Sequence, residues 1–247
     1  MEINIFILCY NEEVLIPQTI KHYKHFLPNC KITILDNHST DKSVDIAKQN
    51  GCDIISWGEV EEIDDYRYTD LKNNVWKKIK NGWIIVCDMD EWLCVTIDEL
   101  KEETVNKTTF LDTHGYHMVS DSKCPILSDI NLHQINEGVY WRFKPMCFFR
   151  PDIKETQFSV GTFTYKTKGN FKLSSKRYFF KHMGGHMGFD FYKNKTINRF
   201  LRKKNRTPAN HYTDKIHRIK RVHNEMVTNK KKIGFFDNFL IEIKRNA

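Results

Sequence analysis

Three carboxylates follow an apolar run in the middle of the chain, where the sequence reads WIIVCDMDEW between Trp83 and Trp92. The run is typical of a buried strand, and Asp88, Asp90 and Glu91 come directly after it. Because side chains alternate along a strand, Asp88 and Asp90 are expected on the same side. A divalent cation with waters and phosphate ligands would offset their repulsion. The alternative is that these acids only end a strand and cap the next helix.

The elements before this motif favour the first interpretation. Apolar runs at residues 3–9, 31–36, 53–57 and 83–87 alternate with helical patterns, which predicts βαβ units and a parallel sheet. The runs are continuous, so helices should cover both faces of the sheet. Ligands of such sheets bind beyond the carboxyl ends of the strands, and the acidic motif lies there.

The sequence after residue 108 predicts a different arrangement. Strand-like segments at residues 109–118, 139–149, 162–165 and 178–180 indicate a mixed or antiparallel extension of the sheet. Beyond residue 190 the sequence becomes helical and basic.

Composition limits the class of protein. The 247 residues, 40% of them hydrophobic, suffice for one large domain with a core. The first apolar run is too short for a signal anchor, and the seven cysteines, with no C-x-x-C pair, indicate reduced thiols. Both features favour a cytoplasmic protein.

Positive charge is concentrated near the C-terminus. Between Lys193 and Lys232, fourteen basic residues stand against Asp214 and Glu225, whereas the rest of the chain holds 25 basic and 29 acidic residues. The simplest interpretation is a solvated face of packed helices. Functional alternatives are a clamp over a diphosphate, peripheral contact with an anionic membrane surface and, last, nucleic-acid binding, which is not expected because no motif supports it.

Four motifs in chain order carry a resemblance to a known family. They are Tyr10-Asn11-Glu12, Asp36-Asn37-His38-Ser39-Thr40-Asp41, Lys72-Asn73 and Asp88-Met89-Asp90. Together they resemble the nucleotide-sugar-binding half of family-2-type glycosyltransferases, which have the α/β GT-A fold, a Rossmann-like and mostly parallel sheet with helices on both faces. The resemblance implies a glycosyltransferase domain at residues 1–190 and a basic, mainly helical extension at 191–247. Residues 1–95 would form the nucleotide-sugar-binding half of that domain, and residues 96–190 the acceptor half.

The resemblance also implies roles for single side chains. Tyr10 would lie against the nucleobase, and Asn37, which can both donate and accept, leaves the identity of the base open. The residues implied in nucleotide binding are Tyr10, Asn11, Glu13, Asp36, Asn37, Lys72 and Asp88.

A metal ion is implied by the same resemblance. Asp90 would bind Mn²⁺ or Mg²⁺ bridging the diphosphate, whose charge the cation neutralises as the nucleotide leaves. His182 in YFFKHMGGHMGFD is the first choice for a further ligand, with His186 next. Displacement by an acceptor hydroxyl also needs a general base, for which Asp121 is the first candidate and Glu155 and Asp190 the others.

These features predict a metal-dependent, inverting glycosyltransferase. It would move a sugar from a nucleoside-diphosphate sugar to a hydroxyl of a glycan or lipid-linked acceptor. One alternative is a nucleotidyltransferase of similar fold, although its usual Gly-rich basic first loop is replaced here by the acidic CYNEE. Another is a non-enzymatic protein that binds anions or nucleic acid.

Overall fold

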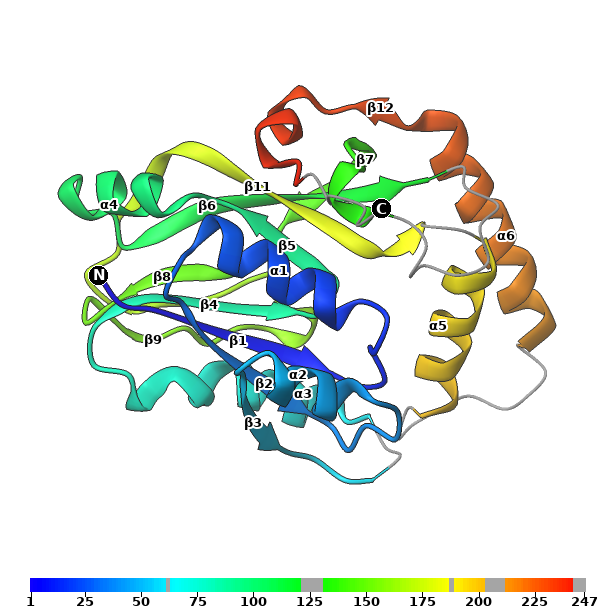
Figure 1. The fold of residues 1–247 in the computed structure, drawn as a ribbon, viewed down its shortest axis with the longest axis horizontal. Coiled ribbons are helices and arrows are strands. Elements are labelled where there is room, and N and C mark those ends of the chain that lie inside the picture. The colour runs from blue at the N-terminus through cyan, green and yellow to red at the C-terminus, as the bar shows by residue number, and fades with distance from the viewer. Residues whose placement is uncertain (61–62, 121–130, 187–188, 203–211, 242–247) are drawn as a thin grey trace.

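The computed structural model describes residues 1–60, 63–120, 131–186, 189–202 and 212–241 (Figure 1). The strands are β1 (Ile3–Cys9), β2 (Lys31–Asp36), β3 (Asp53–Ser56), β4 (Gly82–Asp88), β5 (Glu91–Cys94), β6 (Phe110–Val119), β7 (Glu137–Phe143), β8 (Cys147–Arg150), β9 (Ile153–Glu155), β10 (Lys168–Gly169), β11 (Leu173–His186) and β12 (Lys231–Lys232). The α-helices are α1 (Ile16–Phe26), α2 (Ser43–Gln49), α3 (Asp65–Asn74), α4 (Ile97–Val105), α5 (Phe189–Leu201) and α6 (Tyr212–Asn229). Short 3-10 helices span Val75–Lys78, Leu132–Gln134, Val160–Thr162 and Gly234–Phe239.

The first four strands form a parallel half-sheet in the order β3-β2-β1-β4. β1 lies between β2 and β4, and all seven of its residues are buried. Neighbouring strands satisfy its backbone on both edges, and helices cover both faces, so an almost wholly apolar sequence suits it. The four predicted strands, their parallel pairing and the predicted fold class are confirmed.

The second half extends the sheet with antiparallel pairs. β8 pairs with β4, β6 with β8 and β7, and β12 with β7, while β11 runs parallel to β6 and antiparallel to β5. Two strand predictions were wrong. Residues 139–149 form two strands, β7 and β8, separated by Lys144-Pro145-Met146, and residues 162–165 form no strand because Gly161 and Thr162 have φ of +79° and +59°.

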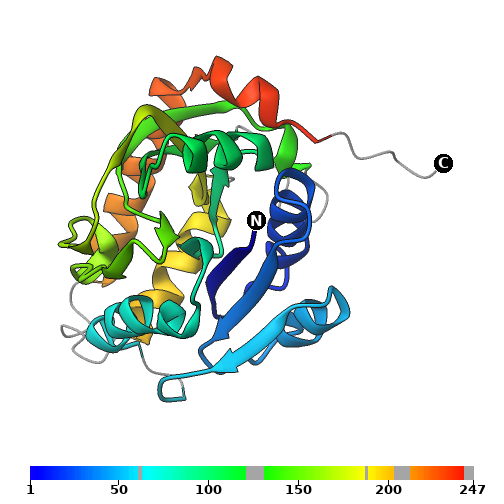
Figure 2. The ribbon, with the colours of Figure 1, turned by 90° about the vertical axis from the view of Figure 1, so that its left-hand side faces the viewer.

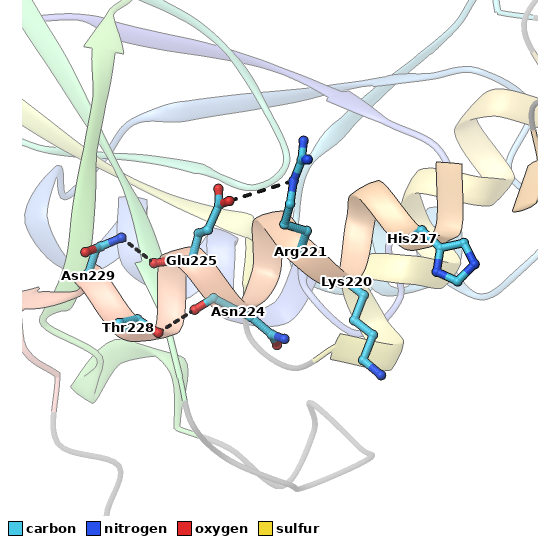
Figure 3. Close-up of a pocket in the computed structure, with 7 residues that line it drawn as sticks. All are labelled: His217, Lys220, Arg221, Asn224, Glu225, Thr228 and Asn229. Atoms are coloured by element: carbon cyan, nitrogen blue, oxygen red, sulfur yellow. Dashed lines mark hydrogen bonds and ion pairs between the residues drawn. The ribbon is translucent and has the colours of Figure 1, made fainter. Parts of the chain in front are cut away.

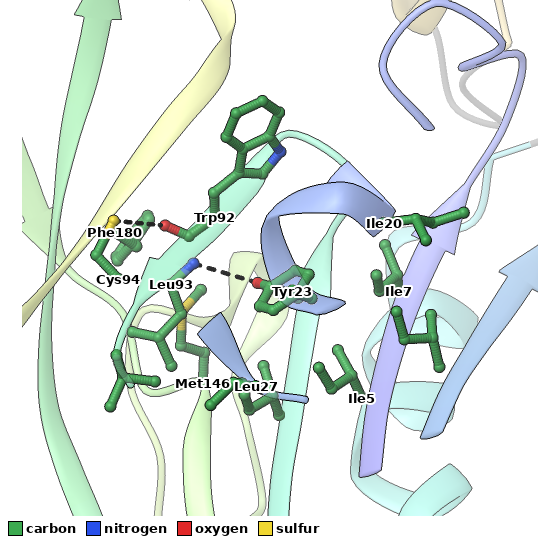
Figure 4. Close-up of a cluster of buried hydrophobic side chains, with 14 of the residues drawn as sticks. Ile5, Ile7, Ile20, Tyr23, Leu27, Trp92, Leu93, Cys94, Met146 and Phe180 are labelled. Carbon is green, nitrogen blue, oxygen red and sulfur yellow. Dashed lines mark hydrogen bonds between the residues drawn. The ribbon is translucent and has the colours of Figure 1, made fainter. Parts of the chain in front are cut away.

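Helices cover both faces of the parallel half, with α1 and α2 on one face and α3 on the other (Figure 2). On the first face, Ile5 and Ile7 of β1 pack in one cluster with Ile20 and Tyr23 of α1 (Figure 4). The alternate residues Phe6 and Leu8 belong to a second cluster that contains Trp76. The apolar side chains of β1 therefore divide between two cores, as their alternation requires.

The end of the chain returns to the main sheet. β12 pairs with β7 at the sheet edge, and Phe236 and Phe239 are buried in the same cluster as Ile5. Among the described cysteines, which are free, all but Cys30 are buried. None of the helices in the described ranges is long and apolar enough to cross a membrane.

His22 on α1 predicts a loss of stability in acid. The ring is 1% exposed, and its Nε2 lies 2.9 Å from the carbonyl oxygen of Leu93. Burial lowers the pKa of His22 to about 3, against 6.5 in an unfolded chain. The unfolded state therefore takes up a proton first, and the free energy of unfolding should fall between pH 6.5 and 3, by at most about 1.4 kcal/mol per pH unit from this side chain.

Urea unfolding at pH 7, 6 and 5 measures this effect. The variant His22→Gln keeps a hydrogen-bond donor but does not titrate, so its stability should depend less steeply on pH than that of the native chain. Equal slopes for the two proteins would contradict the assignment.

Candidate active site

The predicted donor residues meet at the carboxyl ends of β1, β2 and β4. These ends lie side by side because β1 pairs in parallel with both neighbours. Helix α5 stands next to these strand ends (Figure 1). Lys195 on α5 and Arg202 directly after it contact side chains at the same edge. The site therefore combines three strand ends from the first 90 residues with one helix from near the end of the chain.

The loop after β1 is fastened to the loop after β2. Asn11 has a left-handed backbone (φ 52°), and its Oδ1 accepts from the N–H of Thr40 at 2.7 Å. The N–H of Asn11 donates to Oγ of Ser39 at 2.9 Å. Glu13 is exposed and accepts from the N–H of Lys42 at 3.1 Å. Asn11 and Glu13 thus hold the two loops together, and their contact with a nucleotide stays a prediction.

Asp36 and Asn37 are buried at the end of β2. The carboxylate of Asp36 accepts from the N–H of Ser39 at 3.2 Å. The amide of Asn37 donates to the carbonyl oxygen of Trp57 at 3.0 Å, and its Oδ1 accepts from Nη2 of Arg202 at 2.7 Å. The Arg202 guanidinium also lies 3.0 Å from the centre of the Tyr10 ring. Tyr10 and Asn37 are therefore joined by one cation from the C-terminal part of the chain.

Asp88 is held by three donors. Its Oδ1 accepts from Nζ of Lys72 at 2.8 Å and from the Tyr68 hydroxyl at 2.9 Å, and its Oδ2 accepts from Nζ of Lys144 at 3.0 Å. Lys144 also contacts the carboxylate of Glu91, which is fully buried and accepts from the backbone N–H of Asp88. Lys72 and Glu91 therefore fix Asp88 from inside the protein, and any effect of Lys72 on a nucleotide would act through Asp88.

These charges offset one another electrostatically. Burial acts to raise the pKa of Asp88, but Lys144 and Lys72 outweigh it and hold that pKa well below its usual value. Burial acts to lower the pKa of Lys144, and Asp88 and Glu91 reverse the effect and raise it. The four groups form a buried network of two cations and two anions, in which each charge has an opposite partner.

Asp90 faces a different set of partners. β4 ends at Asp88, so strand alternation does not extend to Asp90, which lies in the turn before β5. Its Oδ2 accepts from Nζ of Lys195 on α5 at 2.9 Å and lies 3.8 Å from Nε2 of His182. Burial acts to raise the pKa of Asp90, but Lys195 and His182 together lower it below its usual value.

Lys195 joins Asp90 to Glu12. Its ammonium lies 2.8 Å from Oε1 of Glu12, so one cation bridges two carboxylates. Burial alone would lower the pKa of Lys195, and the two anions raise it. Burial raises the pKa of Glu12 to about 7 against the attraction of Lys195. The two short contacts favour an ammonium flanked by ionised carboxylates.

Asp90 and His182 could hold part of a divalent cation's ligand shell. In the ranges described, no three His, Cys, Asp or Glu side chains gather into a complete metal site. A carboxylate and an imidazole still suit Mn²⁺ if phosphate oxygens and waters supply the rest. Nδ1 of His182 lies 2.9 Å from Nδ1 of His117, and a hydrogen bond donated by His182 there would leave Nε2 with its lone pair facing Asp90.

Three candidate bases were predicted, and none of the three is placed among these groups. Asp121 lies outside the described residues, as does the side chain of His186, the second choice as metal ligand. Glu155 on β9 pairs with Lys168 at 2.9 Å, and Asp190 on the first turn of α5 lies 3.8 Å from Lys193.

Sequence reasoning missed several residues that contact the predicted site residues: Tyr68, Lys144, Lys195, Arg202 and His117. Lys144 carried a usable signal, because it stands alone as a charge in the apolar stretch FKPMCFF and could be buried only with an anion. Lys195 and Arg202 lie seven residues apart, which places them on one face of a helix.

A surface pocket elsewhere is lined by one helix alone. Figure 3 shows side chains of α6 projecting from its exposed side, with Arg221 paired to Glu225 at 3.8 Å. The lining residues are His217, Lys220, Arg221, Asn224, Glu225, Thr228 and Asn229. Because none of the strand ends contributes to it, this pocket is separate from the acidic site.

Known proteins were compared with the chain by sequence and by structure. No curated protein matches. Among solved structures, glucosyl-3-phosphoglycerate synthase from Mycobacterium tuberculosis, in complex with Mn²⁺, UDP and glucosyl-3-phosphoglycerate, is similar over 46% of this chain and 44% of its own, with 15% identity and a TM-score of 0.33. S. aureus TarS 1-349, in complex with UDP-GlcNAc, is similar over 93% of this chain and 74% of its own, with 13% identity and a TM-score of 0.44.

Both TM-scores lie below 0.5, so these two structural similarities are too distant to support a conclusion about this chain. This chain also spans less than half the length of the first protein. The sequence match is more informative. The family model described as glycosyl transferase family 2 matches residues 4–94, the region that contains β1 to β5 and all four motifs. This match confirms the predicted resemblance to a glycosyltransferase family over residues 4–94.

Proposed function

We propose that the protein transfers a sugar, with inversion, from a nucleoside-diphosphate sugar to a hydroxyl of a glycan or lipid-linked acceptor, using Mn²⁺ or Mg²⁺. One observation carries this proposal: within the family-2 region, parallel pairing of β1, β2 and β4 brings Tyr10, Asn37, Asp88 and Asp90 to one edge of the sheet. That edge is where ligands of open α/β sheets bind.

The proposed roles follow from the contacts of each side chain. Tyr10 and Asn37 would hold the nucleobase, one by its ring and the other by its amide. Asp88, whose carboxylate is fixed by Lys72 and Lys144, would orient the ribose or a metal-bound water. Asp90 and His182 would hold the cation, which when bound stabilises negative charge on the departing diphosphate.

On the acceptor side, removal of the hydroxyl proton would fall to Asp121, which lies outside the described residues. We propose residues 1–190 as the catalytic domain and residues 191–247 as its basic extension. The proposed location is cytoplasmic, at a membrane surface if the acceptor is lipid-linked.

A thermal-shift screen tests the donor class. UDP, GDP, CDP, ADP and their common sugars are added to the full chain with and without Mn²⁺. One nucleoside diphosphate should raise the melting temperature, and more so with Mn²⁺, because a ligand that binds only the folded state stabilises it by RT ln(1 + [L]/Kd). No shift with any of them, or a shift only with nucleoside triphosphates followed by pyrophosphate release, would overturn the proposal in favour of a binding protein or a nucleotidyltransferase.

A further inference from the structure

Three cations on or directly after α5 reach the proposed donor site. Lys195 and Arg199 are four residues apart on one face of the helix, and Arg202 follows directly after its last residue, Leu201. Lys195 contacts Glu12 and Asp90, as described above. Arg202 reaches the other end of the site, at Tyr10 and Asn37, and Arg199 lies between them in the chain.

Arg199 responds to the carboxylates of the acidic motif. Its Nη2 lies 3.8 Å from Oδ1 of Asp65. Burial acts to lower the pKa of Arg199, and Tyr68, Asp88, Asp65 and Asp90 raise it. Lys195 therefore contacts the proposed metal ligand Asp90, Arg202 contacts the proposed base-binding residues, and Arg199 stands between them in the chain.

Lys195, Arg199 and Arg202 offset much of the negative charge of the site. Without them, the described strand ends would present Glu12, Asp88 and Asp90, with Lys72, Lys144 and Glu91 beneath, and such an edge would repel a diphosphate. Ammonium and guanidinium groups are the side chains that bind phosphate oxygens, and Arg does so with two parallel donors.

We propose that Lys195, Arg199 and Arg202 form the diphosphate-binding face of the donor site, an inference that rests on the proposed function. In the structure, Lys195 and Arg199 pair with the carboxylates of Glu12, Asp90 and Asp65, and Arg202 donates to the neutral amide of Asn37. On binding, Lys195 and Arg199 exchange these partners for phosphate oxygens. Arg202 leaves the Tyr10 ring, whose face becomes available to the base.

This inference assigns the basic helix α5 to the donor rather than to a membrane surface. The Lys195 side chain is 28% exposed and turned toward carboxylates of the sheet edge. A lipid-linked diphosphate would offer the same phosphate chemistry, but the contact of Arg202 with Tyr10 and Asn37 favours a ligand with a planar base. The two sources are separated by using nucleoside and lipid diphosphates as different probes.

Isothermal titration of the full chain tests the assignment. The probes are UDP, GDP, CDP and ADP, their nucleosides, inorganic pyrophosphate and farnesyl diphosphate, each with Mn²⁺. In Lys195→Gln and in Arg199→Gln the Kd of the preferred nucleoside diphosphate and of pyrophosphate should rise about tenfold or more, because a charge-assisted hydrogen bond is lost. The Kd of the nucleoside should not change, and Lys195→Arg should restore part of the affinity.

The matched control is Lys193→Gln, which removes one charge from the same helix, where Lys193 pairs with Asp190 near its start. Circular dichroism checks that each variant is folded. If Lys195→Gln is not folded, Arg199→Gln alone provides the test. Unchanged affinity for nucleoside diphosphate in both variants overturns this inference and leaves the proposed function standing. Failure of the native chain to bind any nucleoside diphosphate overturns both, and tighter binding of farnesyl diphosphate than of all nucleotides assigns the face to a lipid.

Discussion

Replacing Asp90 with asparagine is expected to lower metal-dependent donor hydrolysis and sugar transfer by about 10³-fold or more, with the fold preserved. An amide is a much weaker ligand for a divalent cation than a carboxylate, and Asp90 with His182 is the ligand pair that the site offers. The fold should survive because Asp90 lies in a turn and Lys195 keeps Glu12 as its partner. Initial rates with the nucleotide sugar found by the thermal screen measure the effect.

The matched control is Asp112→Asn. Asp112 is a partly buried carboxylate on β6 that contacts His114 and Arg177, away from the strand ends of the site. The rate of sugar transfer by Asp112→Asn should remain within about twofold of the native rate. A substitution of a partly exposed side chain away from the site seldom has a large effect. Manganese titration followed by electron paramagnetic resonance gives a second measurement, in which Asp90→Asn and His182→Gln should both weaken binding. Native rates in Asp90→Asn would exclude this residue as the ligand.

Replacing Lys144 with methionine is expected to destabilise the protein by about 3–5 kcal/mol, the usual cost of removing one partner from a buried ion pair. The Lys144 side chain is 3% exposed and is the shared partner of Asp88 and Glu91, the latter fully buried. Methionine has a similar shape but no charge, so Glu91 would stay buried without a cation. Urea unfolding at pH 7 measures the loss as a lower midpoint at unchanged slope.

The double variant Lys144→Met with Glu91→Leu separates charge from packing. Removing both partners leaves no unpaired ion at Glu91, so the double variant should be more stable than Lys144→Met alone. Asp88 would still be held by Lys72 and Tyr68. A double variant that is less stable than the single one would show that the network matters through shape rather than charge.

The parallel half of the fold was predictable from local sequence. The continuous apolar runs of β1, β2 and β4 admit only a strand covered on both faces, and the position of Asp88 and Asp90 at the edge follows from that pairing. The later strands were less predictable, because β7 and β8 are half-exposed and interrupted by Lys144-Pro145, so neither pattern nor length separates them.

The charge partners of the site were the least predictable part. Lys144 and Lys195 meet carboxylates that precede them by 53 and 105 positions, and no local pattern encodes such distances. The sequence analysis assigned nucleotide binding to Glu13, but the fold shows that Glu12 contacts Lys195 while Glu13 is exposed. The bridge between His117 and His182 likewise depends on the parallel register of β6 and β11.

The separation of 183 residues between Glu12 and Lys195 has a consequence for how the protein is made. During synthesis the N-terminal region emerges first, and β1 to β4 can pair while the ribosome still holds the rest. At that stage Lys72 could already offset Asp88, whereas Glu12 and Asp90 would still lack the lysine that joins them in the folded protein. This part of the acidic site can therefore be completed only after α5 has left the exit tunnel.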